Sequence, residues 1–252
     1  MSADAPRPDA DDGEPPDIGR RVVAVAVVVA ALLVVAAATA LALDRRTGGD
    51  AGPTSSTTTV ADLVADQQSG AADFLADWHA WRSIDVVVRS TFVRERADGE
   101  QLTSDMVLAQ QGDRRLVSRL GGAEGYVDDQ RVRCVSESDG TYRCDRTPTG
   151  ATAEQRRRDE LDTWAEYLSG VPPYYRILTL DGGCYELVLT RALPGADFGS
   201  VAEFCFDEAS GALVRTRIQY ANGLVETTEA VVIETEVDAA IFEALQTEPV
   251  GG

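Results

Sequence analysis

Lysine is absent from this chain of 252 residues, whose 23 basic side chains are all arginine, and histidine occurs once, as His79. Without an ammonium side chain the protein has no Walker-type phosphate loop and no Schiff-base lysine. A single histidine excludes multi-histidine metal sites. The 42 acidic residues give a formal charge of -19. This excess argues against a nucleic-acid partner, because nucleic-acid binding depends on cationic contacts to phosphate.

The common catalytic signatures are missing as well. The chain has no Gly-x-Ser-x-Gly elbow, no His-Glu-x-x-His pair and no Gly-x-Gly-x-x-Gly loop. His79 lies off the apolar face of its helical segment, which is typical of a surface histidine rather than a general base. We therefore expect no enzyme activity, no cofactor and no metal.

One long uncharged run is present, from Val22 to Leu43, and it consists of Val, Ala and Leu with one Thr. At about 1.5 Å per helical residue the run extends about 33 Å, enough for the ~30 Å hydrocarbon core of a bilayer. We expect residues 20–46 to form a single-pass transmembrane anchor with its flanks. The alternative, a buried core helix, needs protein on every side of the helix.

A cleaved secretory signal is a further alternative, because Ala38-Thr39-Ala40 is a small-x-small site. The run is longer than a usual signal, however, and a polar tail precedes it, which favours an uncleaved anchor. Arginines flank both of its ends, so they do not fix its orientation. All four cysteines follow the run, and disulfides persist in oxidising compartments. We therefore expect everything after Arg46 to lie outside the plasma membrane.

The rest of the chain divides by composition. Residues 1–19 hold six acidic residues, one arginine and four prolines, which predicts a disordered acidic cytoplasmic tail. Residues 47–59 are rich in Gly, Ser and Thr and are expected to form a linker. Residues 60–248 are expected to form one folded extracellular domain.

Two helical segments are predicted in this domain. The first begins after Thr59, is interrupted near Gly70, and carries an apolar stripe of Phe74, Leu75, Trp78 and Trp81. The second begins at Thr152, which forms a capping box with Gln155, and ends at Gly170 before Pro172-Pro173. Its apolar face consists of Leu161, Trp164, Ala165 and Leu168.

Strand-forming runs separated by turn signals fill the remainder. The predicted strands are 84–96, 102–110, 114–120, 131–135, 141–144, 175–180, 184–191, 201–206, 213–220 and 224–237. Turn signals such as Asp139-Gly140, Pro194-Gly195 and Asn222-Gly223 separate them. Such short spacings favour an α+β fold with a meandering antiparallel sheet, one face of which the two helices cover.

The four cysteines allow three disulfide pairings. Cys134 and Cys144 flank the Asp139-Gly140 turn symmetrically, and Cys184 and Cys205 flank Pro194-Gly195 in the same way. This symmetry favours the pairs 134–144 and 184–205. The alternative is a tetrathiolate zinc site, which the absence of any Cys-x-x-Cys pair disfavours.

The C-terminal strand series resembles a known family. It contains the segments 205–213 (CFDEASGAL), 218–223 (IQYANG) and 237–242 (VDAAIF). An aromatic–Asp…Gly turn, two long strands and an Asp-x-x-x-Phe ending are similar to the C-terminal half of LolA-like proteins. This family includes the lipoprotein carriers, LppX, LprG and the RseB-type stress sensors. The similarity is clearest over residues 201–242.

The resemblance implies a curved antiparallel half-barrel plugged by helices, with an apolar cavity that holds acyl chains. Six side chains on the two helices are the candidate ligand-binding residues: Phe74, Trp78, Trp81, Trp164, Tyr167 and Leu168. The alternative for each of them is that it fills the core. No ligand contact of the family can be matched residue by residue.

Two functional hypotheses follow. The first is a membrane-anchored extracytoplasmic protein that binds a lipid or lipidated ligand in this cavity. The second is an RseB-like regulatory or interaction module of the cell envelope, with a filled core and a protein partner in place of a small ligand.

Overall fold

The computed structural model describes residues 60–193, 196 and 198–247. All of the described residues belong to one compact unit, Thr58–Gly252. The predicted tail, anchor, linker, Thr59 cap and Pro194-Gly195 turn lie outside them. Among the helices within these ranges, none combines the length and the apolarity needed to cross a membrane.

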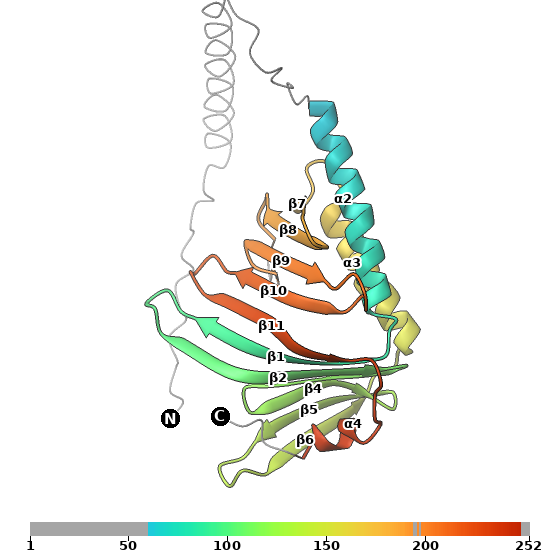
Figure 1. Ribbon diagram of the computed structural model, residues 1–252, viewed down its shortest axis with the longest axis vertical. Helices are drawn as coiled ribbons and strands as arrows, with labels where there is room; N and C mark the ends of the chain where they lie inside the picture. Colours follow the sequence, from blue (N-terminus) through green and yellow to red (C-terminus); the bar gives the residue numbers. More distant parts are fainter. Residues whose placement is uncertain (1–59, 194–195, 197, 248–252) are drawn as a thin grey trace, which may run out of the picture. The chain divides into compact units, whose positions relative to one another are not determined.

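Eleven strands form one antiparallel sheet, which is open and curved (Figure 1). Along the chain they are β1 Val86–Glu95, β2 Gln101–Gln111, β3 Arg114–Arg119, β4 Gly122–Val127, β5 Gln130–Ser136, β6 Tyr142–Pro148, β7 Tyr175–Leu180, β8 Cys184–Leu189, β9 Val201–Phe206, β10 Leu213–Gln219 and β11 Val225–Glu234. Within the described residues three helices accompany them: α2 Val60–Trp81, α3 Ala153–Leu168 and α4 Ile241–Ala244.

The strand order shows how two meanders join. It runs β6-β5-β4-β3-β2-β1-β11-β10-β9-β8-β7, so the chain starts at the centre of the sheet and works outward to β6. α3 then connects this edge to the opposite edge at β7, and the chain returns to β11, which pairs with β1. The predicted meander is confirmed, and the central β1–β11 pairing joins residues that are far apart in sequence.

One strand was not predicted. β4 contains Gly122 and Gly125, residues with low strand propensity, and it lies between the predicted strands 114–120 and 131–135. Its backbone nevertheless pairs with both β3 and β5. Gly125 has φ 158°, and a Cβ atom there would lie 2.0 Å from the carbonyl oxygen of Arg115. Glycine is therefore required for β4 to lie this close to β3.

The expected interruption of the first helix at Gly70 is wrong, because α2 runs unbroken from Val60 to Trp81. A Cβ atom at position 70 would lie 3.1 Å from Thr179 Oγ1 and 3.2 Å from Ile177 Cγ2. Gly70 therefore permits α2 to pack closely against β7. The second helix begins as predicted, since Thr152 Oγ1 accepts a hydrogen bond from the Gln155 amide at 3.1 Å.

Apolar side chains form two cores, one on each face of the sheet. Because side chains alternate along a strand, Val86 and Val88 face the α2–α3 side, while Val87 faces the other side. There Phe242 of α4 is 1% exposed and packs with strand residues such as Leu116. The two predicted helices cover one face as expected, and α4 is an additional element that covers part of the opposite face.

Both favoured disulfides are present. Cys134 lies opposite Cys144 in the β5–β6 pair, with an Sγ–Sγ distance of 2.08 Å. Cys184 lies opposite Cys205 in the β8–β9 pair, with an Sγ–Sγ distance of 2.12 Å. Each disulfide therefore links neighbouring strands, one in each of the two meanders.

Candidate functional site

The aromatic residues predicted to bind a ligand are brought together beneath the two helices. The ring of Phe74 lies 5.6 Å from that of Trp78 and 5.0 Å from that of Trp164, between ring centroids. Phe204 of β9 completes the cluster, 5.5 Å from Trp78 and 5.7 Å from Trp164. These four side chains are at most 6% exposed. Their rings fill the space between the helices and the sheet.

The other three predicted residues lie around this cluster. Trp81 is 1% exposed, and its indole Nε1 is buried without a hydrogen-bond partner among the described residues. Tyr167 is half-buried, with its ring 6.2 Å from Trp164 and 6.0 Å from Tyr175. Leu168 is 3% exposed, and it also lines a groove that opens beside the cluster.

This groove has a volume of about 590 Å³, and its lining is mostly apolar. It runs between the N-terminal half of α2, the C-terminal end of α3 and the loop that follows α3. Its apolar lining residues are Leu63, Val64, Ala71, Ala72, Leu75, Ala165, Leu168, Val171, Pro172 and Pro173. Gln67, Gln68, Ser169, Arg176 and Thr190 supply most of the polar groups of the lining.

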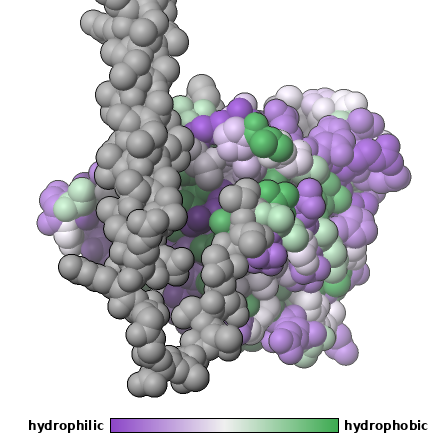
Figure 2. Space-filling model, turned by 90° about the horizontal axis from the view of Figure 1, so that it is seen from above, coloured by the Kyte–Doolittle hydropathy of each residue, from purple (hydrophilic) through white to green (hydrophobic). Residues whose placement is uncertain are grey.

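Large apolar side chains of the groove are open to solvent. Leu63 is 58% exposed, Val64 is 52% exposed, and Val171 has its whole surface exposed. Seen from the end at which α2 begins, Figure 2 shows hydrophobic patches lying in the open among hydrophilic side chains. An exposed apolar concavity is typical of a binding site, because covering it removes apolar surface from water.

One glutamine attaches α2 to the edge of the sheet below the groove. The backbone amide of Ile177 in β7 donates to Gln67 Oε1 at 2.8 Å. Gln67 Nε2 in turn donates to the carbonyl oxygens of Leu168 at 3.2 Å and of Tyr175 at 3.4 Å. The side-chain amide thereby forms hydrogen bonds with backbone groups that an edge strand otherwise leaves unpaired. These bonds hold α2 against β7 at the base of the groove.

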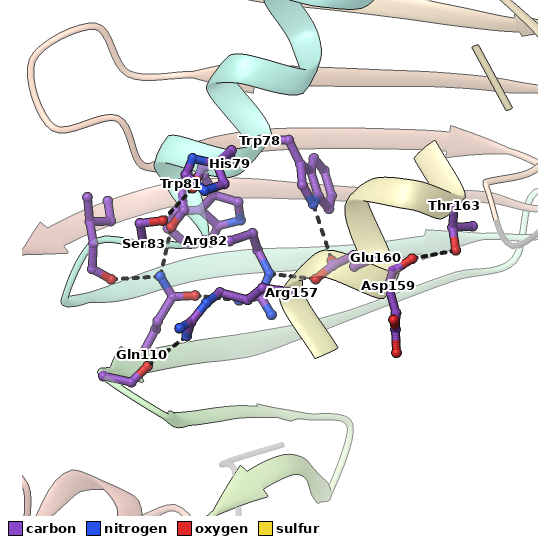
Figure 3. A network of polar contacts seen from close by, with 12 residues as sticks. Trp78, His79, Trp81, Arg82, Ser83, Gln110, Arg157, Asp159, Glu160 and Thr163 are labelled. Carbon is purple, nitrogen blue, oxygen red and sulfur yellow. Dashed lines mark hydrogen bonds and ion pairs between the residues drawn. The ribbon is translucent and has the colours of Figure 1, made fainter. Parts of the chain in front are cut away.

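A polar network holds the helices together at the opposite end (Figure 3). Arg82 Nε donates to Glu160 Oε2 at 2.8 Å, and Arg82 Nη1 donates to Gln110 Oε1 at 2.7 Å. Trp78 Nε1 donates to Glu160 Oε1 at 3.3 Å. Gln110 is 2% exposed, and its Nε2 donates to the Trp81 carbonyl at 2.7 Å. α2, α3 and β2 are thus fixed relative to one another.

A tyrosine links the C-terminal part of α2 to the sheet. Tyr185 of β8 donates its hydroxyl proton to Asp77 Oδ2 at 2.7 Å. Burial and, after it, this hydrogen bond raise the pKa of Tyr185 well above its ordinary value. The tyrosine therefore remains a proton donor at physiological pH, and its role here is structural.

One group of potential metal ligands occurs among the described residues, Cys184, Glu203 and Cys205. Its two cysteines form a disulfide, so neither sulfur is available as a thiolate ligand. His79 is exposed on α2.

Searches for related proteins find similarity at the level of structure alone. No protein-family model matches the chain, and no curated protein matches its sequence. A chain of the MucA/MucB complex from Pseudomonas aeruginosa has 14% identity and a TM-score of 0.42, covering 72% of this chain and 63% of its own. A LolA superfamily protein from Nitrosomonas europaea has 9% identity and a TM-score of 0.30, covering 70% and 96%.

LprF from Mycobacterium bovis is also similar, with 12% identity and a TM-score of 0.32, covering 68% of this chain and 95% of its own. LolA-like and RseB-like proteins are the groups that the sequence resemblance named.

Proposed function

We propose that this protein binds a hydrocarbon chain of a lipid or lipidated ligand in the groove between α2, α3 and the loop at residues 170–173. The observation that carries the proposal is the apolar groove of about 590 Å³ with Leu63, Val64 and Val171 exposed in it. Its size falls in the usual range of small-ligand sites.

The energetics of such a site favour hydrocarbon. Each methylene removed from water contributes about 0.8 kcal/mol, so a segment of about ten methylenes contributes about 8 kcal/mol before the costs of association. Polar groups are concentrated in the side chains of Gln67, Gln68, Arg176 and Thr190. An acyl chain matches the apolar lining, and a polar head is expected to remain near these residues.

The proposed anchor would place the groove near a bilayer. Leu43 ends the predicted membrane span, and Leu63 lies 20 residues further along the chain. A fully extended chain of this length reaches at most about 70 Å. We propose that the protein is anchored by this span with residues 60–248 outside the plasma membrane, so that the groove samples lipids of one membrane surface at high effective concentration.

A second candidate function is a regulatory or interaction module whose groove receives an apolar segment of a protein. The packing of Phe74, Trp78, Trp164 and Phe204 favours this alternative, because these rings occupy the space where an acyl-chain cavity was expected. The predicted cavity residues remain candidates that ligand binding has to test.

The proposal is tested with the full chain purified in a nonionic detergent. We expect organic extracts to contain co-purified lipid by mass spectrometry, and we expect a fluorescent fatty acid to bind saturably. In Val64→Glu the affinity for the probe should fall about tenfold or more, because a carboxylate replaces an apolar wall. Val231→Glu is the matched control, since Val231 is a 71% exposed valine of β11 outside the groove lining.

Blank extracts together with no saturable binding of the fatty acid would rule out the lipid-binding function. Equal loss of affinity in both valine variants would exclude the groove as the site. Saturable binding of an apolar peptide that the fatty acid does not displace would favour the interaction module.

A further inference from the structure

A second pocket lies where α3 begins, at the other end of the helix pair from the groove. Its volume is about 270 Å³, and five arginines line it: Arg82, Arg114, Arg115, Arg156 and Arg157. Two carboxylates, Asp113 and Glu160, share the lining. Because the guanidinium of Arg114 lies over Phe242 on the opposite face of the sheet, four arginines and two carboxylates place their charges in the pocket. Two positive charges are therefore uncompensated there, in a protein whose formal charge is -19.

Most of these guanidinium groups already have partners. Arg82 is paired with Glu160, as described above. Arg156 donates to the Ala151 carbonyl at 2.6 Å and lies over the ring of Tyr126, 4.3 Å from its centroid. Arg114 lies 4.7 Å over the ring of Phe242. These contacts explain how the cluster is held in place, but they leave its excess charge in the pocket.

Arg115 is different, because its Nε is buried and has no hydrogen-bond partner in the described part of the chain. Burial first, and the neighbouring Arg82 next, lower the pKa of Arg115 to about 10. The side chain stays charged at neutral pH, although its charged form is disfavoured. The residue keeps some exposed surface, and it faces the pocket that it lines.

Arg157 is the second proposed donor, because its present contacts are weak. Its contacts are long, since Nη1 lies 3.3 Å from the Gly112 carbonyl oxygen and 3.9 Å from Asp113 Oδ1. Its side chain is 29% exposed. α3 begins beside it, with Ala153 in the lining, so the positive end of the helix dipole adds to the potential in the pocket.

We propose that this pocket is an oxyanion site for a phosphate group, with Arg115 and Arg157 as its principal hydrogen-bond donors. Guanidinium groups bind phosphate through paired, charge-assisted hydrogen bonds. A bound phosphate would accept hydrogen bonds from the terminal Nη groups of Arg115 and Arg157 and would neutralise the excess charge. The same chemistry is offered by a free oxyanion and by the phosphodiester of a phospholipid headgroup.

The test is calorimetric titration of the full chain in nonionic detergent at fixed ionic strength. The two probes are pyrophosphate, for a free oxyanion, and dihexanoyl phosphatidylglycerol, for a lipid headgroup. We expect at least one of them to bind saturably. Loss of one charge-assisted hydrogen bond weakens binding about tenfold or more, which is the effect expected for Arg115→Gln.

Three variants make the outcome decisive. Arg157→Gln, at the more exposed position, should weaken binding as well. Melting curves would show whether Arg115→Gln unfolds the protein, and in that case Arg157→Gln replaces it as the test. Arg143→Gln should leave binding unchanged, because that arginine is 68% exposed and pairs with Glu137 on the β5–β6 hairpin. Val64→Glu should leave pyrophosphate binding unchanged, so this site and the proposed lipid groove can fail independently.

Tighter, Arg115-dependent binding of pyrophosphate would identify a free oxyanion as the ligand, and tighter, Arg115-dependent binding of the lipid would identify a headgroup. Both results support the proposal. The proposal would be overturned if neither probe gave a saturable binding heat. It would also be overturned if Arg143→Gln weakened binding of the probe as much as the pocket variants do.

Discussion

Gln67 shows how one side chain can complete a sheet edge. Its amide oxygen and nitrogen bond to backbone groups of Ile177 and Tyr175 in β7, the outermost strand on that side. Such groups on an edge strand are otherwise left to solvent or to another chain. The position of α2, and with it the floor of the groove, therefore depends on these hydrogen bonds.

Gln67→Leu is expected to lower the free energy of unfolding by about 1–3 kcal/mol, because partly buried backbone groups lose their partners. Urea denaturation monitored by circular dichroism measures the change. Gln68→Leu is the matched control at an exposed neighbouring position, with an expected change within about 0.5 kcal/mol. Equal effects of the two substitutions would show that the bonds to β7 do not hold α2.

Asp207 stabilises the turn between β9 and β10, where its Oδ2 accepts from the Ser210 hydroxyl at 2.6 Å and from the Ser210 amide at 2.8 Å. The hydroxyl bond first, and the amide bond next, lower the pKa of Asp207. Since the folded-state pKa lies below the unfolded value of about 3.9, the stabilisation is complete above that value and is lost as the pH falls through the folded-state pKa.

Asp207→Ala should therefore lower the melting temperature at pH 7, and the difference from wild type should shrink as the pH falls below about 3.9. Differential scanning calorimetry over a pH series measures it. Glu208→Ala removes an exposed carboxylate from the same turn and should show no such dependence. A difference from wild type that grows on acidification would contradict the assigned role.

Among the structural elements, strands with alternating patterns could be predicted closely. The expected bounds of β7 and β9 agree with the structure. β4 was not predicted because its glycines have low strand propensity, and the strand is stabilised by its pairing with neighbouring strands. The helix break at Gly70 was predicted from local propensity, whereas the residue is glycine because β7 lies against it. α4 has four residues, which is too short for a periodic pattern.

The candidate site could be predicted in part. The apolar stripes place Phe74, Trp78 and Trp164 beneath the helices, but no local pattern shows that Phe204, from a distant strand, fills the space beside them. The groove combines Leu63 and its neighbours on α2 with a loop more than 100 residues away in the chain. The sequence does contain a signal for the groove, which is a second apolar stripe on the first half of α2. It was not used because a helix break was expected at Gly70.

α4 was missed in the sequence, yet it carries the residue that closes the second core. Phe242→Ala should lower the free energy of unfolding by about 3–5 kcal/mol, because a fully buried ring leaves a cavity. Chemical denaturation measures this change. Glu243→Ala, at the exposed neighbouring position of the same helix, should change it by less than about 0.5 kcal/mol. A small effect of the phenylalanine substitution would mean that α4 packs only loosely on the sheet.

For the whole molecule, the proposed arrangement is a domain with two disulfides held outside the membrane by residues 20–46. A protease added to intact cells should remove an epitope placed after Gly252, because the entire folded domain is expected to be accessible. A cytosolic protein in the same cells is the control for lysis. If the epitope survives on intact cells and is lost only after lysis, the domain lies inside and the proposed topology is wrong.

The central claim is that hydrocarbon occupies the groove rather than the aromatic core. Photocrosslinking of the full chain with a diazirine-bearing fatty acid, followed by peptide mapping, tests it most directly. We predict labelling of residues 63–75 and 165–173, with competition by unlabelled fatty acid and loss of labelling in Val64→Glu. Labelling spread evenly over the surface, or concentrated on the strands beneath the helices at Phe204 and Phe206, would contradict the claim.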